Sequence, residues 1–486
     1  MPGTRYIARL SAAMPIAATT FGLLGVAFLL ARGGRVSALF IAAAVAAALA
    51  LIGAVLGVRA LLIWVVFSGV AYPFIRYPQL HPYATFDRMM LPAFFGMLLL
   101  HPTAQMVRAR ASRVLVSSTV WLVLAFGFRA LAAGPHHTSA IVTWLDAIVI
   151  PAVIFLAAER FLASEKGLSS LADALTVAGV ALALVGIGER VLGFDLASRT
   201  GGTPRFDQNI GVVRISGPFA VPEVYGLVLV VCLAGTLYRA QTRRRGASWA
   251  VGLGAVCLEL VALESTYFRA VWFAGLAVAV AAFGFRPRRF GRLLVVLAVV
   301  GGILFLASSQ LQQDQTIQAR LNNTQNIDAR LATYRQALTI ARMDPVFGVG
   351  VNRYTDVAET LPRASVAGVG SVPYPHNSYL GLLAEQGLVG LLPLLAVSLA
   401  AWGVFRRLKT LARTREDVLL AAMLGGIGIA YLAMSLSLTM LPYGPSNGIL
   451  AVVLGAAAGR LNALESESVL DTAPELRGGE ARRAIA

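Results

Sequence analysis

Cysteine and charged residues are both scarce in this chain. Only two of its 486 residues are cysteine, Cys232 and Cys257, and only 13% are charged. Both cysteines lie inside long apolar runs, where cysteine behaves as a small hydrophobic residue. The sequence therefore excludes a disulfide framework and a metal site built from cysteines. The pair His136 and His137 has no cysteine or carboxylate partner in register, so it favours a solvated loop over a metal site.

Hydrophobic residues dominate instead. They make up 57% of the chain, and the mean hydropathy is +0.73, which excludes a soluble globular protein. Apolar runs recur from Met14 to Gly459, and the alternating pattern of barrel strands is absent. Since a span takes about 20 helical residues, we expect an all-α polytopic membrane helix bundle of about fourteen spans. The first run follows Arg5 and Arg9 without a small-residue cleavage site, which indicates a signal anchor.

Positive charge exceeds negative charge, and its placement predicts the orientation. The net charge is +17, and the densest clusters lie at the ends of apolar runs: Arg239 with residues 243–245, residues 286–292, and residues 406–415. Short loops rich in arginine and lysine face the cytoplasm. Counting crossings from these loops places both termini in the cytoplasm and segments 193–217 and 309–376 outside it. The excess positive charge therefore mainly reflects the orientation of the protein in the membrane. We expect its partners to be membrane lipids rather than nucleic acid.

The long outer segment has a regular pattern of its own. From Gln325 to Arg342, apolar residues recur at three- and four-residue steps, which predicts an amphipathic helix. The predicted apolar face consists of Ile327, Leu331, Tyr334, Leu338 and Ala341. Asp344 and Pro345 end this helix, and Gly348, Gly350 and Asn352 predict a turn. Residues 461–486 mix both charge signs with glycine and proline, so we expect a disordered cytoplasmic tail.

A histidine stands where this outer segment meets the next apolar run. The segment reads Tyr374-Pro375-His376-Asn377-Ser378. A histidine just before the first turn of a helix feels the positive end of the helix dipole, which disfavours the imidazolium form. The neutral ring nitrogen can then accept a proton, so His376 is the best candidate base. The run from Asn377 to Phe405 exceeds one crossing, so we expect the spanning part to begin near Gly387 and His376 to lie at headgroup depth.

Four groups of residues in this chain resemble the bacterial O-antigen ligase and O-antigen polymerase superfamily. His376, Asn377, Leu380, Glu385, Gly387 and Gly390 match the HN, leucine, E-x-G and further glycine of its signature. Arg330, Tyr334, Asp344, Pro345, Gly348 and Gly350 resemble its R-x3-W/Y and P-x2-G-x-G segment. Arg269 resembles the arginine of its S-R-G/A segment, although Phe268 replaces the serine. Arg214 to Phe219 resembles its R-x-x-G-x-F segment, although Glu223 replaces the asparagine that often follows the next proline.

The resemblance implies both a fold and an activity. It implies a GT-C-like membrane bundle, here one glycosyltransferase-like domain over residues 1–460 with the O-antigen ligase-like core at about 170–405. It implies transfer of a glycan from an undecaprenyl-diphosphate carrier to an acceptor hydroxyl, at the extracytoplasmic face of the bacterial inner membrane. The partners would be that donor, a glycan or lipid-linked acceptor, and membrane lipids. No nucleotide and no cofactor is implied.

The matching residues suit the two tasks of this chemistry. His376 would deprotonate the acceptor hydroxyl as the catalytic base. Arg269, Arg330 and Arg214 would bind the diphosphate, because guanidinium groups pair bidentately with phosphate oxygens. Asn377, Tyr379 and Glu385 are supporting residues; Glu385 falls on the opposite face of a continuous helix from His376, which favours a structural role. The outer segments lack a D-x-D pair, so we expect no metal.

Other interpretations stay open at the level of sequence. Arginines at span ends also reach lipid phosphates, and Arg129 is expected to do only that. A flippase or transporter for lipid-linked oligosaccharide can have similar spans and basic loops, but it has no evident use for segment 309–376 and its terminal histidine. Within the enzyme interpretation, the sequence does not separate a ligase from a polysaccharide polymerase or a protein O-oligosaccharyltransferase.

Overall fold

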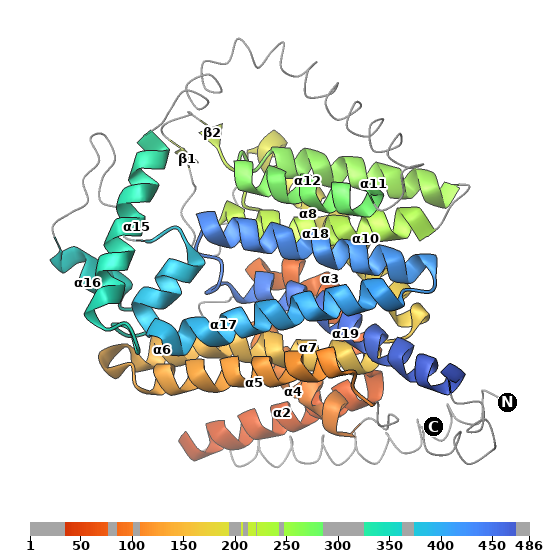
Figure 1. The fold of residues 1–486 in the computed structure, drawn as a ribbon, viewed down its shortest axis with the longest axis horizontal. Coiled ribbons are helices and arrows are strands. Elements are labelled where there is room, and N and C mark those ends of the chain that lie inside the picture. The colour runs from red at the N-terminus through yellow and green to blue at the C-terminus, as the bar shows by residue number, and fades with distance from the viewer. Residues whose placement is uncertain are drawn as a thin grey trace, which may run out of the picture.

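The computed structural model describes residues 35–75, 85–100, 107–193, 206–207, 212–219, 221–242, 247–284, 325–361 and 374–472. In this part of the chain the protein is a bundle of helices that run roughly side by side, with two further helices, within residues 325–361, packed across one end (Figure 1). The prediction of a polytopic helical membrane protein is confirmed.

The helices of the first half are α2 (Arg35–Leu56), α3 (Val58–Ile75), α4 (Phe86–Leu100), α5 (Arg110–Leu131), α6 (His137–Trp144), α7 (Ile150–Phe161) and α8 (Glu165–Leu192). A 3-10 turn, η1 (Gly134–His136), precedes α6, and a π-helical turn, η2 (Leu145–Val149), joins α6 to α7. Two short strands, β1 (Phe206–Asp207) and β2 (Val212–Val213), form an antiparallel pair. The helices of the second half are α10 (Pro222–Thr242), α11 (Ala247–Glu264), α12 (Arg269–Gly284), α15 (Gln325–Met343), α16 (Tyr354–Thr360), α17 (Ser378–Leu411), α18 (Arg415–Ser437) and α19 (Gly444–Thr472).

Seven helices or helix groups of the described residues are long and apolar enough to cross a membrane, or eight if a bent pair counts as one span. That pair is α2 and α3, which meet at an angle of 111° at Gly57, where φ is 53°. The predicted total of about fourteen spans includes apolar runs before residue 35 and between residues 285 and 324, which lie outside the described residues. The total therefore stays a prediction.

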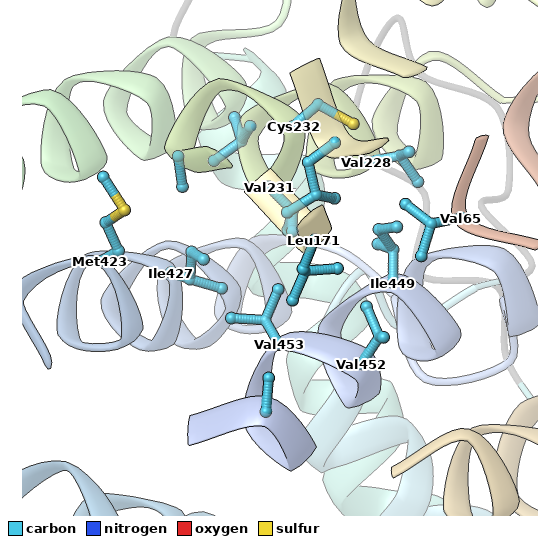
Figure 2. Close-up of a cluster of buried hydrophobic side chains, with 14 of the residues drawn as sticks. Val65, Leu171, Val228, Val231, Cys232, Met423, Ile427, Ile449, Val452 and Val453 are labelled. Atoms are coloured by element: carbon cyan, nitrogen blue, oxygen red, sulfur yellow. The ribbon is translucent and has the colours of Figure 1, made fainter. Parts of the chain in front are cut away.

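Helix α10 lies at the centre of the bundle. Nearly every one of its side chains is buried, as expected of a helix that is hydrophobic all round. Figure 2 shows Val228, Val231 and Cys232 of α10 surrounded by Leu171 of α8, Met423 and Ile427 of α18, and Ile449, Val452 and Val453 of α19. Peripheral α5 buries a much smaller share of its surface. Packing in this core fixes the relative positions of α8, α10, α18 and α19, and therefore also the positions of the loops at their ends.

The two ends of the bundle differ in composition. At one end, which we call the basic end, lie the described arginines of the predicted cytoplasmic loops, at the start of α5 and α18 and in the last turns of α10 and α17. At the other end, α15 and α16 pack across the helix termini, and we call it the α15–α16 end (Figure 1). A tight turn joins α11 to α12, since α11 ends at Glu264 and α12 begins at Arg269.

Charged side chains at the basic end pair with one another. The Arg108 guanidinium donates to both carboxylate oxygens of Glu159 at 2.9 to 3.1 Å. Arg460 lies 2.7 Å from Asp417, and these two side chains are 8% and 0% exposed. Buried charges are tolerated when they are paired and hydrogen-bonded in this way.

Two sequence expectations need correction. The predicted helix in the outer segment is present as α15, but Leu331 and Leu338 are exposed, and its buried face contains Thr333, Ala337 and Ile340. Small residues on that face allow α15 to approach α17 closely at Ala384. The tail was expected to begin at residue 461, yet α19 continues to Thr472.

The reason for the longer helix α19 is visible at the basic end. Leu461 and Leu464 are buried in the main core, and Glu465 accepts a hydrogen bond of 2.8 Å from Arg407 of α17. Tertiary contacts therefore extend a helix that local composition predicted to have ended. The last residues of the chain lie outside the described part.

Candidate functional site

Helix α17 is interrupted near its start, and residues 345–350 form backbone hydrogen bonds with the residues on both sides of the interruption. Gly387 has φ 61° and ψ −155°, values open only to glycine, and it interrupts the helix. Across the interruption, the N–H groups of Val349 and Gly350 donate to the carbonyls of Ala384 and Glu385, at 2.9 Å each. In return, the N–H groups of Leu388 and Val389 donate to the carbonyls of Pro345 and Val346 at 2.9 and 3.1 Å.

This exchange explains two of the sequence motifs together. A Cβ on Gly348 would lie 2.4 Å from the backbone nitrogen of Gln386, and one on Gly387 would lie 2.3 Å from the carbonyl oxygen of Val346. Both positions need glycine because the two backbones touch. The P-x2-G-x-G and E-x-G segments are therefore the two halves of one backbone junction, which we call the α17 junction. The helix is interrupted at the residue near which the sequence predicts the spanning part to begin, and where the span begins stays a prediction.

His376 lies immediately before the N-cap of α17. Asn377 caps the helix, its Oδ1 accepting from the N–H groups of Tyr379 and Leu380 at 3.0 Å each. His376 itself has φ 46°, a left-handed conformation that is uncommon outside glycine. Ser378 fastens the turn from the other side, donating to the Leu438 carbonyl at 2.9 Å and accepting from the Met440 N–H at 2.8 Å. The backbone that carries the His376 imidazole is therefore fixed by hydrogen bonds of the residues that follow it.

A pocket of about 430 Å³ lies at the α15–α16 end, and His376 is part of its wall. Its volume is within the range of small-molecule sites. The wall is built from six parts of the chain: α5 and α6–η2, the start of α10, residues 351–355, residues 374–376, the first turns of α17, and the 438–443 turn between α18 and α19. We call it the His376 pocket.

The ionisable side chains in the wall of the His376 pocket include carboxylates but no described lysine or arginine. Two carboxylates, Glu223 and Glu385, are part of its wall, and among the described residues that line it there is no lysine or arginine. Glu385 shares the pocket with His376, contrary to the opposite-face expectation, because His376 precedes the helix and the chain turns at that residue. Glu385 also holds the wall together, since its carboxylate accepts from the backbone N–H of Tyr354 at 3.1 Å and from that of Asn352. Tyr379 packs behind the pocket with Leu382 and Leu441.

The loops that carry Arg214 and Arg269 contact each other. The Arg214 guanidinium lies 5.6 Å above the ring of Phe268, the residue before Arg269, so phenylalanine here provides a stacking surface where the family has serine. Arg269 is exposed at the first position of α12. The pair therefore presents two cations outside the His376 pocket.

Adjacent residues at the end of α8 hold both of these loops. The Glu189 carboxylate accepts from the N–H groups of Ser216 and Gly217 at 3.2 and 2.8 Å. Arg190 donates to Glu264 and Ser265 at 2.7 Å each, and to the Tyr267 hydroxyl at 3.1 Å. One dipeptide thus fixes the loop that carries Arg214 and the turn that carries Arg269.

Arg330 lies on α15, one turn before the residues that contact the His376 turn. The Tyr334 hydroxyl donates to the Leu436 carbonyl at 2.6 Å and lies 3.5 Å from the His376 carbonyl oxygen. The Thr333 hydroxyl lies 3.4 Å from the Pro375 carbonyl oxygen. Because residues four apart share a helix face, Arg330 and Tyr334 are on the same side of α15.

Sequence reasoning missed the residues that fasten the outer segment. Arg129, expected only to reach lipid, donates to the Gly348 carbonyl at 3.2 Å and lies 5.7 Å from the Phe347 ring centre. Asn352 donates to the Thr143 hydroxyl at 3.1 Å. His136, expected in a solvated loop, lies 2.8 Å from a carboxylate oxygen of Asp356. These partners are more than 200 residues apart in the chain, so no local pattern signals them.

Residues 253–395 match the O-antigen ligase family. The matched stretch runs from α11 through the outer segment into α17, and so includes Arg269, Arg330, His376 and the α17 junction. No curated protein matches the chain. The resemblance seen in the motifs to the O-antigen ligase and O-antigen polymerase superfamily is thus confirmed over these residues.

Proposed function

We propose that this protein is a membrane glycosyltransferase that moves a glycan from an undecaprenyl-diphosphate carrier to an acceptor hydroxyl. The observation that carries the proposal is that His376, which lies in the stretch matching the O-antigen ligase family, is part of the wall of a pocket. The product belongs to surface polysaccharide biosynthesis. The proposed chemistry is the same for three possible acceptors: lipid A core, a growing repeat-unit chain or a protein.

The proposed reaction needs one proton acceptor. The acceptor oxygen attacks the anomeric carbon of the donor glycan, and the bond from that carbon to the diphosphate oxygen breaks. The hydroxyl proton goes to a ring nitrogen of His376, and the diphosphate leaves on the carrier lipid. The N-terminal end of α17 favours the neutral imidazole that this step requires before attack.

The proposed leaving group needs cations. Arg214, which stacks on Phe268, and the adjacent Arg269 would bind the diphosphate oxygens, and Arg330 would approach from α15. Guanidinium groups keep their charge and pair with phosphate through two hydrogen bonds, so they can stabilise the charge that builds as the bond breaks. Metal-independent transfer follows from this assignment.

The proposal includes an orientation. The arginines of the basic end would face the cytoplasm, together with both termini, and the α15–α16 end would face outside. In a variant without Cys232 and Cys257, a cysteine at Gln325 should react with a membrane-impermeant thiol reagent in intact cells, and one at Thr410 should not. The reverse labelling pattern would put His376 on the wrong side for this reaction.

The test of the base uses two substitutions. Because His376 has a left-handed φ, which asparagine tolerates better than alanine, His376→Asn removes the imidazole with less backbone strain than His376→Ala. Both variants should still bind undecaprenyl diphosphate in lipid nanodiscs and lose about 100- to 10,000-fold in transfer. His137→Ala, at the exposed histidine of the same end, is the matched control and should transfer at the wild-type rate. More than about a tenth of wild-type transfer in His376→Asn would contradict the assignment.

A further inference from the structure

Glu189 is a buried carboxylate that no step of the proposed reaction uses. It lies in the last turn of α8, and only 8% of the residue is exposed. One of its oxygens, Oε2, accepts from the backbone N–H groups of both Ser216 and Gly217. A carboxylate is costly to bury unless strong hydrogen bonds compensate. Both of these bonds go to the loop that carries Arg214.

Apolar contacts also hold the Arg214 loop against the bundle. The Ile215 and Phe219 side chains are 3% and 2% exposed. The Tyr225 ring lies against Gly217, since a Cβ added there would be 2.6 Å from a ring carbon. Apolar contacts are not directional, so they attach the loop without fixing its orientation. Hydrogen bonds are directional, and the two bonds to Glu189 therefore set the orientation of the loop.

The turn that carries Arg269 has a separate anchor. Arg190 donates to Glu264 and Ser265 at 2.7 Å each, and its guanidinium also lies 5.6 Å from the Tyr267 ring centre. Each of the two loops is thus fastened to its own residue at the end of α8. The separation of the two cations therefore depends on both anchors, and a change at Glu189 should move Arg214 relative to Arg269.

We propose that Glu189 is a positioning residue of the diphosphate site, which orients the Arg214 loop so that Arg214 and Arg269 bind one diphosphate together. The role assigned to Glu189 rests on the proposed function, which gives these two arginines to the leaving group. Glu189 does not contact the ligand, because a carboxylate repels phosphate oxygens and its Oε2 already accepts two hydrogen bonds. Two guanidinium groups bind one diphosphate well only at a suitable separation.

The sign of the effect separates positioning from electrostatics. A negative charge beside two cations weakens their attraction for phosphate. Charge alone therefore predicts tighter binding of a diphosphate in Glu189→Ala and Glu189→Gln, and unchanged binding in Glu189→Asp. Positioning predicts a different order. Glu189→Gln keeps an oxygen at the same reach, Glu189→Asp is one carbon shorter, and Glu189→Ala has no acceptor.

The test measures the affinity of these variants for undecaprenyl diphosphate in lipid nanodiscs. One arginine's hydrogen bond to phosphate is worth about 10- to 100-fold in affinity. Glu189→Ala and Glu189→Asp should therefore weaken binding about 10-fold, and Glu189→Gln less than about 3-fold. Should Glu189→Ala not fold, Glu189→Asp carries the same test, because it keeps the carboxylate.

Glu159→Ala is the matched control. Glu159 is also a buried carboxylate, 3% exposed, but it accepts from Arg108 at the basic end. Its substitution should lower thermal stability and leave the affinity per folded molecule at the wild-type level. A purely structural role for Glu189 would give Glu189→Ala and Glu189→Asp this same pattern.

A double-mutant cycle tests whether Glu189 acts through Arg214. In the Arg214→Ala background, Glu189→Asp should weaken binding less than about 2-fold, because the loop then carries no guanidinium to position. The same 10-fold loss with and without Arg214 would overturn the inference, as would tighter binding in Glu189→Gln or wild-type binding in Glu189→Asp. Each of these results leaves the proposed function intact, since the wild type binds the probe. If wild-type protein binds no undecaprenyl diphosphate, the proposed function fails and the role of Glu189 fails with it.

Discussion

The two ends of the bundle satisfy their polar groups in different ways. At the basic end, Arg108, Arg407 and Arg460 each lie within hydrogen-bonding distance of a carboxylate from another helix. At the α15–α16 end, the His376 pocket gathers buried polar atoms that lack a described protein partner. Ion pairs between helices thus satisfy charged groups at one end, whereas several buried polar groups at the other end have no described protein partner. Substitutions at the two ends should therefore differ in whether they change stability or activity.

The largest effect is expected at the α17 junction, where a substitution should abolish both stability and activity. Gly387→Ala would force a side chain into a glycine-only conformation and place its Cβ 2.3 Å from the Val346 carbonyl oxygen. We expect almost no monodisperse protein after solubilisation, measured by size-exclusion chromatography, and no transfer. The matched control is Gly403→Ala in the same helix, where an added Cβ meets no other atom within 4 Å. Normal yield and transfer in Gly387→Ala would show that the junction is dispensable.

A purely functional effect is expected at the arginine loops. Arg269→Lys keeps the charge of an exposed residue and removes its second hydrogen bond to phosphate. Since a hydrogen bond to a charged group is worth about 1.5–3 kcal/mol, transfer should fall about 10- to 100-fold at an unchanged protein level in the membrane. Arg335→Lys, at another exposed arginine, should not change the rate. Equal rates in both variants would make Arg269 an ordinary interfacial residue.

The opposite result is expected at the basic end. Asp417→Ala leaves buried Arg460 without its 2.7 Å partner, which should lower the free energy of unfolding by about 3–5 kcal/mol. Glu465→Ala, which removes the partner of half-exposed Arg407, should cost at most about 1 kcal/mol. Transfer per folded molecule should be normal in both, measured after correction for the folded fraction. A lower rate per folded molecule in Asp417→Ala would contradict the expectation that the basic end contributes to stability and not to activity.

The smallest effect concerns metal removal. The described residues contain no group of three or more histidine, cysteine or acidic side chains that could hold a metal ion, and arginines are assigned to neutralise the leaving group. Transfer in liposomes should therefore be the same with and without EDTA. Loss of transfer that magnesium or manganese restores would show that the arginines at the α15–α16 end do not suffice.

Sequence patterns identified His376 and the outer helix but not the pocket. His376, the Asn377 cap and the helix ending before Asp344 were readable because each depends on neighbours within a few residues. The burial of the Tyr354 and Thr439 hydroxyls without a described partner could not be predicted, because it depends on the folded surroundings and not on residue type. The exposed face of α15 was misjudged for a related reason: close packing against Ala384 favoured its small residues over its leucines.

The α17 junction also bears on how such a protein can change over generations. Asn352 and Tyr354 on one wall of the pocket, and Glu385 and Gln386 on the other, are joined through main-chain hydrogen bonds between residues 345–350 and 384–389. These bonds do not depend on side-chain identity except at the glycines, where a side chain would separate the two backbones. Side chains that face the ligand can therefore be replaced while the width of the cavity is preserved. The junction therefore separates the shape of the pocket from the chemistry of its wall, and only the glycines are required by both backbones.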